Sequence, residues 1–145
     1  MRLLPTTGPN MLRDVFPFLL REGEFIESGT IWEGSRFCSC AAEGQPERSR
    51  NGVNLALGEL IAGAGEVAID AGLTQLVCVF DARIYRVLKA AGCDPQIIGR
   101  PRSIGGTMSY AALFDVGEGP LQLIREALGI RGSVLAPVAR ELVAA

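Results

Sequence analysis

The chain has 145 residues, of which 48% are hydrophobic and 21% charged, and its 14 basic and 16 acidic side chains leave a net charge of −2. This length suits one domain, the mean hydropathy of +0.27 excludes a disordered chain, and the near-neutral charge gives no electrostatic reason to bind nucleic acid. The chain contains no histidine. Ser–His and Cys–His catalytic pairs and imidazole metal ligands are therefore excluded, and acid–base chemistry falls to carboxylates, hydroxyls, thiols, backbone groups or water.

The predicted elements begin with a short apolar strand over 2–4, which stops at a turn rich in proline and glycine. Residues 11–20 carry apolar side chains at helical spacing, and an internal proline limits this helix to one or two turns. A polar loop over 21–29 then leads to a strand over 30–40, where aromatic and β-prone residues gather.

The middle of the chain holds the most regular pattern. Residues 51–71 repeat apolar side chains every three or four positions, which predicts a helix with one apolar face that Gly72 ends. Residues 75–80 form an apolar run typical of a strand buried on both faces. Asp81 then begins a second helix over 82–92, as its N-cap.

Two further strands, over 95–98 and 106–116, precede a short helix over 118–128 and a helical tail over 133–144. The order is thus β-α-β-α-β-β, which predicts an α/β (α+β) domain with helices packed on a mixed sheet.

The four cysteines are Cys38, Cys40, Cys78 and Cys93, and they form no C-x-x-C pair. A zinc site is therefore not expected, and reduced thiols fit a cytoplasmic protein. No stretch resembles a signal peptide or approaches the length of a membrane span. We expect a soluble cytoplasmic protein with no metal, no membrane and no nucleic acid among its partners.

Two motifs carry a resemblance to a known family. Residues 2–9 read Arg-Leu-Leu-Pro-Thr-Thr-Gly-Pro and continue into Met-Leu-Arg-Asp-Val-Phe-Pro over 11–17, and residues 32–37 read Trp-Glu-Gly-Ser-Arg-Phe. Together with residues 76–92 and the Ile-Gly-Gly-Thr segment over 104–107, they closely resemble the acyl-homoserine-lactone (autoinducer) synthases of bacterial quorum sensing.

The resemblance implies an N-acetyltransferase-like mixed sheet with a V-shaped cleft and flanking helices. Family members form N-acyl-L-homoserine lactone from S-adenosylmethionine, a co-substrate, and an acyl chain carried on acyl carrier protein or sometimes coenzyme A. The methionine amine attacks the thioester, and the methionine carboxylate displaces 5'-methylthioadenosine to close the lactone. The resemblance implies no permanently bound cofactor.

Family members also carry a segment ahead of the Arg-Leu-Leu-Pro motif, with an Arg, a Phe, a Trp and two Asp that help bind S-adenosylmethionine. Met1 stands immediately before the motif here, so we expect an amino-terminally truncated domain over 1–145. Two alternatives stay open. One is a non-catalytic truncated remnant, and the other is a different acyl-CoA-dependent N-acyltransferase, for which residues 44–52 offer no clear pyrophosphate loop.

The resemblance gives Glu33, Ser35 and Arg36 as candidate catalytic residues. Amine attack requires a base, and without histidine Glu33 is the best candidate, directly or through water. Positions three apart on a regular strand face opposite ways, so Glu33 and Arg36 share one cleft only if the strand bulges, which Gly34 permits. An ordinary Glu–Arg pair is the alternative, and Ser35 hydrogen-bonds either a catalytic water or backbone.

The candidate residues for S-adenosylmethionine are Arg2, Arg36, Phe37 and Trp32. The two guanidinium groups would hold the methionine carboxylate, or pair with Glu33. On a regular strand Phe37 shares a face with Glu33, and both aromatic side chains either line the nucleotide pocket or fill the core.

An acyl chain requires an apolar tunnel. By position in the match, its lining residues would be Ile61, Phe80, Ile84, Val87 and Leu88, with Cys93 beside them; by composition alone these are core residues. Phe80 has no hydroxyl and favours an unsubstituted chain, an inference that Thr107 and Ser109 would reverse if they face the tunnel.

A basic stripe runs along the second helix through Arg83, Arg86 and Lys89, with Arg100 and Arg102 as a possible extension. Because acyl carrier proteins are acidic, the stripe suits carrier docking. A solvated helix face explains it equally well.

Overall fold

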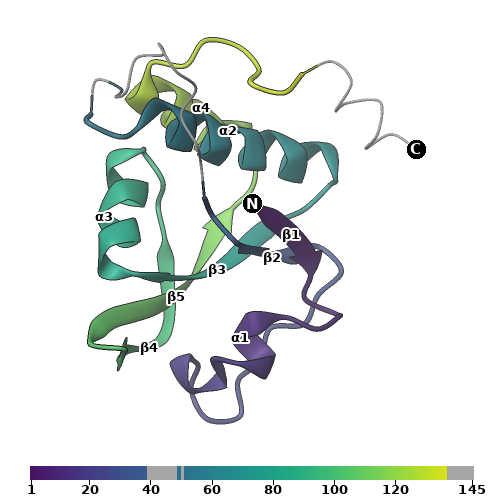
Figure 1. The fold of residues 1–145 in the computed structure, drawn as a ribbon. Coiled ribbons are helices and arrows are strands. Elements are labelled where there is room, and N and C mark those ends of the chain that lie inside the picture. Colours follow the sequence, from purple (N-terminus) through teal and green to yellow (C-terminus); the bar gives the residue numbers. More distant parts are fainter. Residues whose placement is uncertain (39–48, 50, 137–145) are drawn as a thin grey trace.

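The computed structural model describes residues 1–38, 49 and 51–136, which fold around one five-stranded sheet in the order β1-β2-β3-β5-β4 (Figure 1). The strands are β1 (Arg2–Pro5), β2 (Ile31–Ser35), β3 (Gln75–Asp81), β4 (Gln96–Ile104) and β5 (Thr107–Asp115). The helices are α1 (Met11–Asp14), the 3-10 helix η1 (Pro17–Leu19), α2 (Leu55–Asp70), α3 (Ala82–Ala90) and α4 (Glu118–Leu128). Because β2 and β3 pair in parallel and the other neighbours are antiparallel, the sheet is mixed, as predicted.

The parallel strands β2 and β3 part at one end. Their pairing runs from Ile31 opposite Gln75 to Gly34 opposite Cys78, whereas β3 continues to Asp81. Arg36, just past the end of β2, has a φ of 53°, and among the described residues it is the one non-glycine in this left-handed region. The chain therefore turns away from β3, which opens a V-shaped cleft in the sheet.

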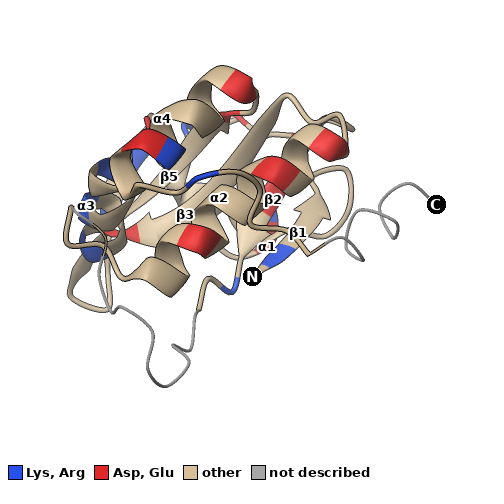
Figure 2. Cartoon of the chain, turned by 90° about the horizontal axis from the view of Figure 1, so that it is seen from above, with Lys and Arg blue, Asp and Glu red and all other residues tan. Residues whose placement is uncertain are grey.

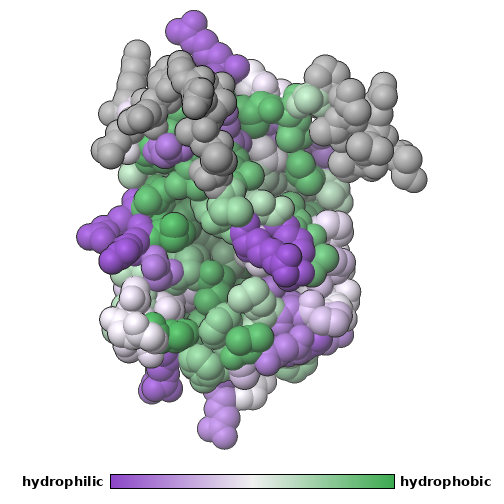
Figure 3. All heavy atoms as spheres, in the orientation of Figure 1, coloured by the Kyte–Doolittle hydropathy of each residue, from purple (hydrophilic) through white to green (hydrophobic). Residues whose placement is uncertain are grey.

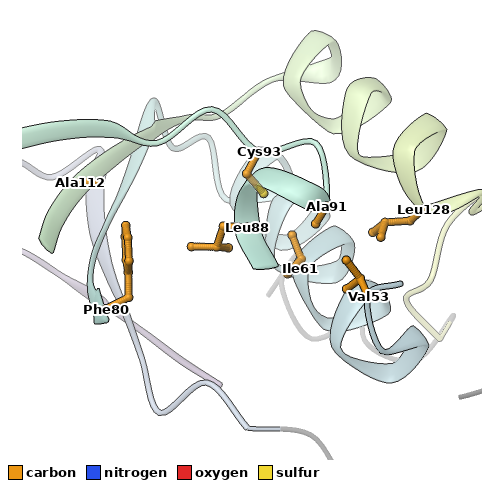
Figure 4. Packing of buried hydrophobic residues seen from close by; sticks show 8 residues of the cluster. All are labelled: Val53, Ile61, Phe80, Leu88, Ala91, Cys93, Ala112 and Leu128. Carbon is orange, nitrogen blue, oxygen red and sulfur yellow. The ribbon is translucent and has the colours of Figure 1, made fainter. Parts of the chain in front are cut away.

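The helices cover the two faces of the sheet unequally. Figure 1 shows α2, α3 and α4 on one side and α1 on the other. Strand alternation sets this division: Cys78 and Phe80 pack among α2, α3 and α4, whereas Val77 and Val79 pack with α1 and η1. Figure 4 shows the larger cluster, which consists of Val53, Ile61, Phe80, Leu88, Ala91, Cys93, Ala112 and Leu128.

The edge strand β4 is longer than the predicted strand, which ended before Gly99 and Pro101. A register shift between Ile98 and Arg102 forms a bulge that absorbs both residues, and an edge strand tolerates proline. Gly99 has a φ of +65°, and a Cβ there would overlap the carbonyl oxygen of Leu19. This close approach fixes β4 against η1 and requires glycine.

Two predicted elements are shorter in the structure. The long helix begins at Leu55, because the Asn54 side chain accepts a hydrogen bond from the Leu57 N–H at 3.1 Å and caps it there. The predicted strand over 30–40 ends at Ser35, where Arg36 turns. Of the predicted helical tail, residues 133–136 are irregular and the rest lies outside the described residues.

The other helix boundaries follow the sequence closely. The predicted helix over 118–128 is confirmed as α4. Asp81 is confirmed as the N-cap of α3, since its Oδ1 accepts from the N–H groups of Arg83 and Ile84 at 2.9 Å each. Pro17 divides the predicted helix over 11–20 into α1 and η1.

A buried ion pair joins α2 to α4. Glu66 is 5% exposed and accepts from Arg125 Nη2 at 2.8 Å, from the Ser133 hydroxyl, and from the N–H groups of Val134 and Leu135. Burial raises the pKa of Glu66, but these donors outweigh it, so the pKa lies below its ordinary value of 4.5. The ionised carboxylate thus fixes α4 against α2.

Candidate active site

A cavity of about 160 Å³ opens where β2 and β3 part. Its walls come from the end of β2, the middle of β3, the end of β5 and the facing sides of α2, α3 and α4. The lining residues are Met1, Gly34, Ser35, Arg36, Phe37, Ile61, Ala64, Gly65, Leu76, Cys78, Val79, Phe80, Ile84, Leu88, Cys93, Phe114, Asp115, Val116, Gly117, Pro120, Leu121 and Ile124. Figure 3 shows hydrophobic residues around a hollow at the centre of this face, with hydrophilic groups on both sides.

The structure brings most of the candidate acyl-pocket residues together. Ile61, Phe80, Ile84 and Leu88 line the cavity, and Cys93 lies beside them. In Figure 4 the side chains of Phe80 and Leu88 face each other from β3 and α3. Val87 is the exception: it packs against the same hydrophobic cluster without lining the cavity.

Sequence reasoning missed the wall that β5 and α4 supply. Phe114 of β5 and Val116, just after that strand, line the cavity on one side, and Leu121 and Ile124 line it from α4. The spacing of Leu121 and Ile124 indicates an apolar helix face, but no local signal in the sequence says that this face packs opposite α2. The contribution of α4 therefore depends on tertiary packing.

The mouth of the cavity is built on Gly34 and Arg36. A Cβ at Gly34 would lie 2.8 Å from Cys78 Sγ, so a larger residue would force this side chain to move. The left-handed turn at Arg36 carries Phe37 to the cavity side, where it packs against the cluster that contains Phe80. The expectation that Phe37 shares a face with Glu33 is therefore wrong, because it assumed a regular strand.

Glu33 faces away from the cavity and toward α1. It is 2% exposed, and its Oε2 and Oε1 accept from the N–H groups of Met11 and Leu12 at 2.9 and 2.8 Å. The bulge at Gly34 that would bring Glu33 and Arg36 into one cleft does not form, because pairing on both sides of β2 is regular there. The structure thus separates the side chains of Glu33 and Arg36.

The hydrogen bonds that Glu33 accepts complete the amino-terminal cap of α1. Asn10 Oδ1 accepts from the N–H of Arg13 at 2.9 Å, and Asp14 Oδ2 accepts from the N–H of Asn10 at 3.0 Å. Together with Glu33, they satisfy four backbone N–H groups that a helix start otherwise leaves without partners.

The other candidate residues of β1 and β2 lie beside the mouth or in the core. Arg2 stands opposite Ser35 in the sheet, and its Nε donates to Ser35 Oγ at 3.4 Å. Ser35 lines the cavity, whereas Arg2 does not. Trp32 packs in a separate cluster around Leu76 and donates from Nε1 to the carbonyl of Gly29 at 3.2 Å, so it lies outside the cavity.

The basic stripe of α3 is exposed. Arg83, Arg86 and Lys89 all face solvent, and Figure 2 shows blue residues gathered along α3 at one end of the molecule. Lys89 Nζ lies 3.2 Å from Asp94 Oδ1. Within the part of the chain that the structure describes, Arg83 and Arg86 form no ion pair, which leaves their charge available.

The thiols in the cavity are not nucleophiles at neutral pH. Burial raises the pKa of Cys78 and that of Cys93 to about 12, so both stay protonated. Cys38 is exposed, and Cys40 lies outside the described residues. In the described ranges, no three Cys, Asp or Glu side chains gather as a metal site would require.

None of the helices among the described residues is long and apolar enough to span a membrane.

Comparisons with curated proteins and with solved structures point to the same family. A probable acyl-homoserine-lactone synthase from Sinorhizobium fredii is 38% identical over 112 residues, which is 76% of this chain and 52% of that protein. Among solved structures, MesI, a CoA-dependent acyl-homoserine lactone synthase, superposes with a TM-score of 0.77 at 26% identity, over 94% of this chain and 65% of MesI. TofI, solved in a ternary complex with an inhibitor and MTA, superposes with a TM-score of 0.68 at 30% identity, over 92% of this chain and 63% of TofI.

The chain thus spans between about half and two-thirds of the length of these relatives. The autoinducer synthase family itself matches over residues 1–124, which contain every strand of the sheet and all of the residues that line the cavity. The chain therefore belongs to the autoinducer synthase family.

Proposed function

We propose that this chain acts as an acyl-homoserine-lactone synthase, which forms N-acyl-L-homoserine lactone from S-adenosylmethionine and an acyl thioester. The observation that carries the proposal is the apolar cavity between β2 and β3, whose mouth lies beside Arg36 and Ser35. An apolar cavity with a few polar groups at one end suits an acyl chain whose thioester stays at the polar end.

Arg36 and Arg2 are the proposed ligands of the methionine carboxylate. Arg36 is exposed at the mouth, and Arg2 lies one strand away, in contact with Ser35. A guanidinium fork matches the two oxygens of a carboxylate. The left-handed φ of 53° at Arg36 is unfavourable for a residue with a Cβ, which supports a role for that turn in aiming the chain at the site.

The reaction forms two bonds. The methionine amine attacks the thioester carbonyl, and the carrier thiol leaves with a proton. The methionine carboxylate then attacks its own γ-carbon and displaces 5'-methylthioadenosine. TofI has been solved with MTA, the leaving product in this scheme.

Glu33 is proposed as a positioning residue for this reaction rather than a base in direct contact with the amine. Both of its oxygens already accept backbone hydrogen bonds, and direct contact would require these bonds to break. We propose that the amine proton leaves through water at the mouth, beside Ser35 and Arg2.

The proposed acyl donor is an acyl carrier protein that docks on α3. Arg83 and Arg86 are free of ion pairs within the described ranges, and their helix supplies Ile84 and Leu88 to the cavity wall. An acidic carrier on this helix would thus stand next to the cavity. MesI depends on CoA, so acyl-CoA is the second donor to test. Because S-adenosylmethionine and acyl thioesters are made in the cytoplasm, we place the reaction there.

The test uses the purified chain with S-adenosylmethionine and either acyl carrier protein thioesters or acyl-CoA, with mass spectrometry of the products. Formation of lactone and methylthioadenosine in equal amounts supports the proposal; no lactone with either donor contradicts it. Charge reversal of Arg83 and Arg86 to Glu should slow the carrier reaction more than the CoA reaction, and added salt should narrow the difference. If the variant slows the reactions with both donors equally, α3 is not the docking site of the carrier.

A further inference from the structure

We propose that the cavity selects a saturated, unsubstituted aliphatic acyl group of about six to eight carbons, and that Gly65 of α2 sets this length. The inference rests on the proposed function, because it names the acyl group that the proposed reaction uses.

The volume limits the chain. The cavity measures about 160 Å³, and apolar cavities of about 150 Å³ in other proteins hold a six-carbon ring. If the carbonyl stays at the mouth beside Ser35 and Arg36, about six further carbons fill the space. A much longer chain would need the walls to move.

Beyond the mouth, the described walls offer no fixed side-chain donor to a substituent on the chain. Apart from Ser35 and Arg36 at the mouth, the polar side chains along the described walls are Asp115 and the thiols of Cys78 and Cys93. The Asp115 carboxylate is occupied: Gln75 and Gln96 donate to it at 2.9 and 2.8 Å. The thiols are protonated weak donors.

The hydroxyls that would have favoured a 3-oxo group lie elsewhere. Neither Ser109 nor Thr107 lines the cavity, and Ser109 Oγ lies 3.4 Å from the Thr107 carbonyl. A 3-oxo group that turns toward the apolar walls, away from Ser35 and Arg36 at the mouth, would therefore lose its hydration without gaining a strong hydrogen bond.

The length of the cavity depends on a glycine. Gly65 and Ala64 leave space between α2 and α4, and a Cβ at Gly65 would lie 3.3 Å from Leu121 Cδ1, within the cavity lining. The next residue of α2, Glu66, forms an ion pair with Arg125 of α4. The two helices therefore cannot move apart easily to accommodate an added methyl group.

The matched pair of variants is Gly65→Ala and Gly119→Ala. Both exchange a helical glycine for a better helix former, but a Cβ at Gly119 meets no atom within 4 Å, and Gly119 does not line the cavity. Loss of long-chain binding in the first variant alone would thus come from the filled cavity. Ile124→Ala, on the opposite wall, enlarges the space and should have the reverse effect.

The first measurement is calorimetric titration of the chain with straight-chain carboxylates from butanoate to dodecanoate, which needs no catalysis. We expect affinity to rise about fourfold per methylene up to hexanoate or octanoate and then level off. Gly65→Ala should weaken octanoate binding about fourfold or more and spare butanoate, and Gly119→Ala should bind as the unchanged protein does. A rise that continues to dodecanoate, or a Gly65→Ala profile identical to that of Gly119→Ala, would overturn the inference.

In the second measurement, the chain reacts with S-adenosylmethionine and a mixture of saturated and 3-oxo thioesters of equal length. Mass spectrometry then quantifies the two lactones. Preference for the saturated lactone supports the inference, and preference for the 3-oxo lactone overturns it. If carboxylates bind with the expected plateau but no lactone forms, the proposed function fails while the inference about the cavity stands. If lactone forms but no carboxylate binds, the inference about the cavity fails and the proposed function stands.

Discussion

Substitution of Glu33 by Gln distinguishes two roles of this carboxylate, a positioning role and that of a catalytic base. The carboxylate accepts from Met11 and Leu12 at 2.9 and 2.8 Å, whereas an amide keeps one acceptor oxygen and turns its NH₂ donor toward the other N–H. A hydrogen bond to a charged group contributes about 1.5–3 kcal/mol, and an unsatisfied buried donor costs about 1–3 kcal/mol. Glu33→Gln should therefore lower the free energy of unfolding by about 2–4 kcal/mol.

Urea denaturation followed by circular dichroism measures this loss, and the same samples are assayed for methylthioadenosine release. The control is Glu59→Gln, an exposed carboxylate on α2, which should change the free energy of unfolding by less than about 0.5 kcal/mol. We expect Glu33→Gln to lose activity in proportion to the folded fraction and to the displacement of α1. A variant with unchanged stability and no methylthioadenosine release would refute this reasoning and restore Glu33 as the base.

Three further predictions concern the fold. Because its donors hold the pKa of Glu66 below 4.5, this group stabilises the protein above pH 4.5 and loses that contribution as the pH falls further; Glu66→Gln should flatten the acid limb of a stability–pH profile. Gly99→Ala should lower the free energy of unfolding by about 3 kcal/mol or more, measured by denaturant titration, because its Cβ overlaps backbone at a left-handed φ; wild-type stability would contradict the close approach to η1. Iodoacetamide at neutral pH should label Cys38 in the native protein and Cys78 and Cys93 only after unfolding, since burial raises the pKa of the latter two thiols to about 12; peptide mass spectrometry reads the labels.

The sequence predicted most of the elements, because their local signals are strong. The N-cap at Asp81, the apolar run of β3 and the apolar face of α4 are each visible in a few consecutive residues. The end of β4 could not be predicted, since Gly99 and Pro101 break a strand unless a bulge on an edge strand accommodates them. That bulge depends on η1, which is distant in the sequence.

The candidate site was only partly predictable for a related reason. Gly34 is the residue that would permit a bulge, yet the conformational change occurs two residues later, at Arg36, a residue type that rarely adopts a left-handed φ. This displacement put Phe37 on the cavity side and left Glu33 on the face of α1. No pattern of residue types in the motif distinguishes these two geometries.

The bulged edge strand also bears on how the protein behaves at high concentration. An exposed edge offers unpaired N–H and C=O groups to the edge of another sheet, and such pairing leads to aggregation. Pro101 removes one donor from β4, Gly99 bends the strand, and Arg100 and Arg102 place two like charges on the same exposed segment. These features hinder β-strand addition at this edge of the sheet. They also give Arg100 and Arg102 a role on β4 that is independent of the basic stripe on α3.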